Sequence, residues 1–255
     1  MRTTMRILMI NPNTTAAVTE RMLAAAKSAA APLTELVPLT AARGVPYVAT
    51  RAEAQIGGAI VLEMLAENHA GANAAIIAAF GDPGLMGARE LFDLPVVGAS
   101  EAAMLTACML GRTFSIVTFS RALGPWYREC VEMHGLTARL ASIRMIGGTF
   151  RSIADVQEEQ QELLVSAANS AVSEDEADVV IFGGGPLAGL ADKVKDRIGA
   201  PVVDPMAAAV KQAEALCALN VRKATAGAFR RPDPKATVGL ADALARRLEH
   251  RDGSV

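Results

Sequence analysis

Short, mainly apolar runs alternate with longer stretches of mixed character along this chain. Residues 74–80 and 179–182 are continuous apolar runs, and residues 6–10 and 114–118 are nearly so. Continuous runs of this length are typical of strands that are buried on both faces of a parallel sheet. The pattern therefore predicts buried strands that are separated by longer, helical connections.

The two halves of the chain repeat the same order of elements. A helical stretch follows the first strand in each half, at residues 16–30 and 121–134. Each half then has a second apolar run, a glycine-rich loop and a Pro-Val-Val segment, at 95–97 and 201–203, before an alanine-rich helix. Strands that alternate with helices imply parallel sheets built from right-handed βαβ units. We therefore predict an α/β fold of two pseudo-symmetric lobes, each a mainly parallel sheet flanked by helices.

The two lobes are expected to face each other across a cleft. The first lobe is assigned to residues 1–98 plus 209–255 and the second to 99–208, because a helical pattern at 238–248 is expected to pack back on the first lobe. In open α/β sheets, ligands bind outside the carboxyl ends of the strands. The loops that follow the strands are therefore expected to line a ligand site between the lobes.

Composition and charge favour a small-molecule function. The 255 residues are 51% hydrophobic and 20% charged, with a formal net charge of −2, so the chain can bury a proper core. Without a basic field, binding to nucleic acid or to a membrane surface is not expected. No apolar segment reaches the roughly 18 residues that span a bilayer, and the run at 7–10 is too short for a secretory signal. We therefore expect a cytoplasmic protein.

Two glycine-rich loops, at residues 80–85 and 182–187, are the main candidates for a binding site. Consecutive glycines at 183–185 allow several backbone N–H groups to converge on one point, which suits a carboxylate or an enolate-like oxygen. The simpler alternative is that these glycines only permit a tight turn between strand and helix. On the first interpretation, the substrate-binding residues of the loops are Phe80, Gly81, Gly183, Gly184, Gly185 and Pro186.

Polar residues at the strand ends are further candidates. Asn13 follows the first strand and is expected to donate a hydrogen bond to substrate, and Thr118, beside Phe119, is a candidate hydroxyl donor at the equivalent strand. Their neighbours have an alternative role as helix caps. Asp82 is the one carboxylate within a glycine loop and is a candidate general base, although Asp-Pro-Gly is also an ordinary turn sequence. Asp82 and Thr118 are therefore the candidate catalytic residues.

Neither a metal nor a cofactor is expected. The three histidines, His69, His134 and His250, are scattered without metal-ligand spacing, and phosphate-loop and dinucleotide motifs are absent. The three cysteines are an odd number without CxxC spacing. They fit reduced, buried thiols better than a disulfide framework or a zinc site.

Motifs longer than a lone glycine pattern occur at residues 5–14, 80–85, 88–90, 95–98, 111–118 and 201–204. Together they resemble the hydantoin racemase branch of the aspartate/glutamate racemase superfamily, over nearly the whole chain. The resemblance implies a two-lobed fold, a small-molecule site between the lobes that needs no cofactor, and a homo-oligomer. It also implies that Tyr47 borders the substrate, because residues 44–47 resemble the family's loop at the edge of the site.

The chain departs from this family at two positions that matter for chemistry. Racemases of the family carry a cysteine immediately before the Phe-Gly-Asp-Pro-Gly segment and another in the second loop, one on each face of the substrate carbon. Here these positions are Ala79 and Gly184. Inverting a stereocentre by proton transfer requires a base on one face and an acid on the other. A methyl group and a hydrogen atom supply neither, so efficient two-thiol racemisation is not expected.

Three functions are compatible with this sequence. The main expectation is an enzyme that binds a small carboxylate or cyclic ureide, with Ala79 at its site, and performs cysteine-independent chemistry of the hydrolase or lyase type. One alternative is a hydantoin or amino-acid racemase silenced by the loss of both cysteines, through natural divergence or, at position 79, through an engineered change. The other alternative is a non-catalytic protein that binds a small molecule.

Overall fold

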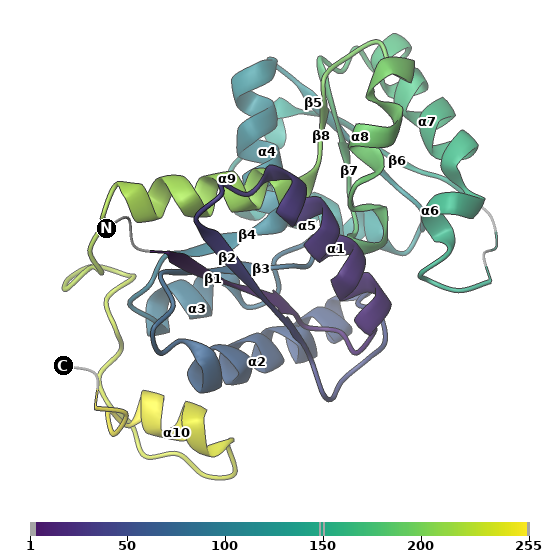
Figure 1. The fold of residues 1–255 in the computed structure, drawn as a ribbon. Coiled ribbons are helices and arrows are strands. Elements are labelled where there is room, and N and C mark those ends of the chain that lie inside the picture. Colours follow the sequence, from purple (N-terminus) through teal and green to yellow (C-terminus); the bar gives the residue numbers. More distant parts are fainter. Residues whose placement is uncertain (1–3, 148, 150, 254–255) are drawn as a thin grey trace.

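The computed structural model describes residues 4–147, 149 and 151–253, and it contains two parallel sheets of four strands each. The first sheet is formed by β1 (Met5–Asn11), β2 (Thr34–Thr40), β3 (Ala74–Ile77) and β4 (Val96–Gly98); the second is formed by β5 (Phe114–Thr118), β6 (Leu140–Met145), β7 (Val179–Phe182) and β8 (Val202–Val203). The strand orders are β2-β1-β3-β4 and β6-β5-β7-β8, so one topology occurs twice (Figure 1). The predicted α/β fold with two pseudo-symmetric lobes is confirmed.

Helices flank both sheets (Figure 1). They are α1 (Ala16–Ala29), α2 (Arg51–Asn68), α3 (Leu85–Leu91), α4 (Ala99–Leu110), α5 (Leu123–Met133), α6 (Val156–Glu159), α7 (Gln161–Ser173), α8 (Leu190–Val194), α9 (Pro205–Ala218) and α10 (Asp242–Leu248), with short 3₁₀ helices η1 (Thr137–Arg139), η2 (Gly185–Leu187) and η3 (Lys195–Arg197). Helices α4 and α9 pack against each other where the chain passes between the two sheets. The helices predicted at 16–30 and 121–134 are confirmed within one or two residues.

The central strands explain the continuous apolar runs of the sequence. All residues of β3 and of β7 are buried, because each strand lies inside its sheet and helices cover both faces. Parallel strands in this position have no solvent-facing side, so alternation of polar and apolar residues is lost. The carboxyl ends of β3 and β7 lead directly into the two glycine loops.

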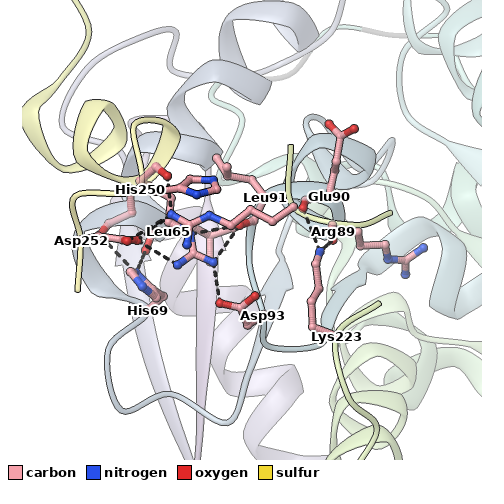
Figure 2. Close-up of polar contacts among 12 residues, drawn as sticks. Leu65, His69, Arg89, Glu90, Leu91, Asp93, Lys223, His250 and Asp252 are labelled. Carbon is pink, nitrogen blue, oxygen red and sulfur yellow. Dashed lines mark hydrogen bonds and ion pairs between the residues drawn. The ribbon is translucent and has the colours of Figure 1, made fainter. Parts of the chain in front are cut away.

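The C-terminal segment packs on the first sheet's helices. Helix α10 contacts α2, and the fully buried Arg247 donates to the Leu91 carbonyl at 3.0 and 2.8 Å and to Asp93 at 2.6 Å. Nearby, Lys223 donates to the Glu90 carbonyl at 2.8 Å (Figure 2). These cations satisfy carbonyl groups at the end of α3, which otherwise lack intrahelical partners. The segment thus stabilises the helix that follows the first glycine loop.

The helix predicted at 238–248 is shorter in the structure and begins at Asp242. Gly239 has a φ of +74°, a backbone conformation that a right-handed helix does not contain. The chain therefore turns before the helix begins. The division into residues 1–98 plus 209–255 and 99–208 stays a prediction; α9 contacts both α1 and α4 and so touches helices from either side of that division.

Candidate active site

The two glycine loops meet at a small cavity between the lobes. The cavity has a volume of about 20 Å³, and a compartment of about 10 Å³ shares several of its walls. One water molecule needs about 10–15 Å³ of such space. Both loops contribute to the walls, which include Asn13, Tyr47, Ala79, Phe80, Tyr127, Gly184, Gly185 and Pro186. The two loops therefore meet between the lobes, as predicted, and the cavity that they line is nearly closed.

Ala79 and Phe80 of the first loop and Gly184 and Gly185 of the second line this cavity, and their backbone amides have no hydrogen-bond partner among the described residues. The Gly81 amide also lacks a partner within the described part of the chain, although the Asp82 amide donates to the Ala79 carbonyl at 3.0 Å. Unpaired amides in a closed site suit a carboxylate or a polarised carbonyl oxygen.

Position 184 strongly favours glycine in this structure. Gly184 has a φ of +127°, and a Cβ there would stand 2.9 Å from Cε1 of Phe119 and 3.6 Å from the hydroxyl of Tyr127. Residues with a side chain rarely adopt this backbone conformation. The Phe119 ring therefore occupies the space that a side chain at 184 would need.

Two polar side chains, Asn13 and Tyr47, line the cavity with unused hydrogen-bond capacity. The Asn13 side-chain oxygen accepts from Asn11 Nδ2 and from the Thr15 amide, both at 3.0 Å, and its side-chain nitrogen has no partner among the described residues. The Tyr47 hydroxyl is buried and also lacks a partner there. Burial, with smaller effects of Tyr127 and Glu53, holds the pKa of Tyr47 well above its usual value. Tyr47 is therefore a neutral phenol that donates.

Asp82, a predicted general base, lies on the side of the first loop away from the cavity. Its carboxylate accepts from the Ser100 amide at 2.9 Å, the Ser100 hydroxyl at 2.5 Å and the Glu101 amide at 2.8 Å, and Asp82 is 2% exposed. It thereby binds the amino end of α4, where backbone donors and the helix dipole stabilise an anion. In this arrangement the carboxylate holds the loop and does not face the small cavity.

Thr118, the other predicted catalytic residue, lies directly behind the second loop. Its hydroxyl donates to the Gly183 carbonyl at 2.8 Å and also interacts with the Tyr127 hydroxyl. Burial, with Cys130 nearby, raises the pKa of Tyr127. Thr118 thus fixes the loop and the phenol of Tyr127. Thr15 is the N-cap residue of α1, but its hydroxyl makes no cap hydrogen bond and donates instead to the Pro46 carbonyl at 2.6 Å.

The remaining predicted residues fall into two places. Gly81 lines a larger cavity of about 630 Å³ on the far side of the first loop, together with Asp82 and Trp126. Phe119 and Gly183 pack behind the cavity walls, against Gly184 and Tyr127. Sequence reasoning did not place Tyr127 at the site, although the aromatic pair Trp126-Tyr127 was a signal for packing between lobes or subunits.

The described residues contain neither a metal-binding cluster nor a disulfide bond. No group of three or more His, Cys, Asp or Glu side chains is placed there to hold a metal ion, and the three cysteines are free. Among the helices of the described ranges, none combines the length and apolarity needed to cross a membrane. Burial, with Asp82 and Glu129 nearby, raises the pKa of Cys130 to about 12, so this thiol is not a ready nucleophile.

Two matched lobes with a small cavity between them define a two-lobed α/β protein. A family model described as Asp/Glu/Hydantoin racemase matches residues 7–213, and the chain belongs to this family. The hydantoin racemase of Paenarthrobacter aurescens is 35% identical over 91% of this chain and 99% of its own length. The hydantoin racemase of Pseudomonas sp. (strain NS671) is 32% identical over 95% and 98%.

Solved structures extend the comparison to the fold. Allantoin racemase from Klebsiella pneumoniae superposes with a TM-score of 0.89 at 35% identity, covering 94% of this chain and 98% of that one. Arylmalonate decarboxylase shares the fold alone, with a TM-score of 0.58 at 17% identity. The hydantoin and allantoin racemases favour the racemase alternative over the expected hydrolase or lyase chemistry, and the decarboxylase bears on the fold alone. The homo-oligomer and the cytoplasmic location stay predictions.

Proposed function

We propose that this chain is a racemase-family protein that binds a five-membered cyclic ureide of the hydantoin or allantoin class between its lobes, with two-base racemisation silenced at positions 79 and 184. The main support for this proposal is the match over nearly the whole chain to hydantoin racemases and to allantoin racemase. Hydantoin and allantoin share the same ureide ring, so both comparisons point to one ligand chemistry.

The donors at the cavity suit this ring. A cyclic ureide presents two ring carbonyl oxygens, and the unpaired amides of residues 79–80 and 184–185 are donors of the required kind. Tyr47 and Asn13 add a phenol and a side-chain amide. Buried donors without partners cost free energy that a ligand carbonyl recovers. The ligand therefore replaces hydrogen bonds that the closed protein lacks.

Proton transfer at the ring carbon lacks its usual participants. One positioned acid or base contributes about 10²- to 10⁴-fold to the rate. Ala79 and Gly184 carry no exchangeable side-chain proton, and the raised pKa values of the two phenols at the cavity, Tyr47 and Tyr127, keep them protonated, so that neither can accept the ring proton. We therefore expect ligand binding with little inversion of the stereocentre.

One experiment separates these possibilities. Purified protein is titrated calorimetrically with allantoin and with a 5-substituted hydantoin, and exchange of the ring C–H for deuterium is followed by NMR in D₂O. The expected result is saturable binding and an exchange rate no faster than in buffer. Rapid exchange or loss of optical rotation would show an active racemase, and ring opening in the same spectra would show hydrolase chemistry. Absence of binding would refute the proposed ligand class.

A further inference from the structure

His134 connects the second lobe to the first glycine loop on the side away from the small cavity. It follows α5, and its side chain is 4% exposed. Its Nδ1 lies 3.3 Å from a Glu101 oxygen, and its Nε2 lies 3.6 Å from Oδ2 of Asp82, without a hydrogen-bond partner within the described ranges. The imidazole therefore stands between two carboxylates that belong to other elements.

These side chains form a buried charge cluster of Asp82, Arg89, Glu101 and His134. Arg89 on α3 donates to Glu101 at 2.9 Å and to the Val96 carbonyl at 2.9 Å. With Arg89 charged, the two carboxylates need one further cation for balance, and His134 is the group in contact with both. A buried carboxylate without a cation costs several kcal/mol of effective desolvation.

The environment keeps His134 protonated at neutral pH. Burial alone lowers the pKa of His134, but Asp82 and Glu101 together outweigh burial and raise the pKa to about 9. For Glu101, burial raises the pKa, but His134 and Arg89 overcome it and lower the pKa to about 2. On α5 itself, Cys130 and Tyr127 also interact with Asp82, and Glu129 interacts with Cys130.

The position of Asp82 fixes the backbone that lines the small cavity. Its amide donates to the Ala79 carbonyl at 3.0 Å, and its carboxylate is bound by α4. One further bond links this loop to the second lobe, from the Cys130 thiol to the Gly81 carbonyl at 3.4 Å. A shift of Asp82 would therefore move the unpaired amides of residues 79–81.

We infer that His134 is a positioning residue for the first glycine loop. Its imidazolium pairs with Asp82 and Glu101 and thereby holds the amides of residues 79–81 in place against the second lobe. The effect on the loop depends only on the buried charge cluster, whereas the effect on ligand affinity also rests on the proposed function. Deprotonation of the imidazole should loosen the loop without unfolding the sheets.

The direction of the pH dependence follows from the raised pKa. A group whose pKa is higher in the folded than in the unfolded state stabilises most below the unfolded value, here about 6.5, and loses that effect as pH rises through about 9. Loop order should therefore decline between neutral pH and about pH 10. Replacement of His134 by a neutral residue should remove this decline.

The test compares wild type with His134→Gln and with the control His250→Asn. His250 is exposed, and its ring nitrogen contacts the Pro232 carbonyl in the C-terminal segment (2.9 Å). NMR gives the pKa of His134 and the exchange rates of the hydrogen-bonded Asp82 and Leu85 amides of this loop at about pH 7 and about pH 10, corrected for intrinsic rates. We expect wild-type protection to fall by up to about 70-fold between these pH values, because a folded pKa of about 9 against about 6.5 unfolded gives about 1.8 log units over this range. H134Q should be weakly protected at both pH values, and H250N should match wild type.

Two results would overturn the inference: equal loop protection in wild type and H134Q at both pH values, or an imidazole that titrates near 6.5. If H134Q does not fold, Glu101→Gln tests the inference instead, because it should lower the pKa of His134, as measured by NMR, by about one unit. Allantoin affinity is the functional readout, expected to weaken about tenfold in H134Q at neutral pH. If allantoin binds neither protein, the proposed function fails, while the exchange data still decide the role of His134.

Discussion

Replacing Gly184 with alanine should destabilise the protein strongly, although it adds only a methyl group. Two effects act at this position. The backbone has a φ of +127°, and strain of this kind costs about 1–3 kcal/mol for a residue with a side chain. The new Cβ would stand 2.9 Å from the Phe119 ring, and overpacking of a core costs about 1–3 kcal/mol more.

A smaller opposing effect comes from the unfolded state. Alanine restricts the unfolded chain more than glycine does, which contributes about 0.4–1 kcal/mol in favour of folding. The net loss of unfolding free energy should therefore be about 1–6 kcal/mol. Urea denaturation, followed by circular dichroism, measures this difference directly. Gly199→Ala is the matched control, because Gly199 has no positive φ and a Cβ there meets no atom within 4 Å.

The double variant G184A/F119A separates the two effects. Removing the Phe119 ring relieves the steric contact but leaves the backbone strain, so the two substitutions should couple by about 1–3 kcal/mol in a double-mutant cycle. If G184A is as stable as G199A to within about 0.5 kcal/mol, both the backbone and the packing argument are wrong. A side chain with an exchangeable proton at 184 would meet the same obstacle, so restoring a cysteine there requires a smaller residue at 119.

Further predictions concern the C-terminal segment, the charge cluster and the ligand. Arg247→Met should lower the unfolding free energy by about 3–5 kcal/mol, because it leaves buried acceptors such as the Leu91 carbonyl without a donor. Arg246 is exposed, so Arg246→Met is the control and should change the unfolding free energy little; thermal unfolding compares the two variants. The low pKa of Glu101 makes the wild-type protein lose stability as pH falls from 4.5 towards 2, and Glu101→Gln should make this loss smaller. An equal loss of stability in both proteins would contradict the low pKa of Glu101. Tyr47→Phe should not lower stability, since the hydroxyl lacks a partner among the described residues, but should weaken allantoin binding roughly 2- to 10-fold; unchanged affinity would exclude the phenol from the site.

The sequence was a good guide to the strands and to the meeting of the loops. Strands such as β3 and β7 are recognisable because burial on both faces makes every residue apolar. Their carboxyl ends must meet where parallel strands of the two lobes face one another, so Ala79 and Gly184 were predicted to lie together, as the structure shows.

Side-chain direction was the part that the sequence could not supply. Asp82 was a candidate base because it sits in the loop, but an unpaired helix end lies within its reach and binds its carboxylate. His134 was only one of three scattered histidines, since its partners Asp82 and Glu101 lie on distant segments that the fold brings together. Contacts of this kind depend on the packing of α4 and α5, which no local pattern specifies.

The size of the space between the loops has a kinetic consequence. With about 20 Å³, it cannot accept a ureide ring until Tyr47, Phe80 or the lobes themselves move aside. Association should then be gated: the observed binding rate should rise with ligand concentration and level off at the rate of opening. Stopped-flow measurements that show such saturation would identify the closed protein as the resting state from which every binding event begins.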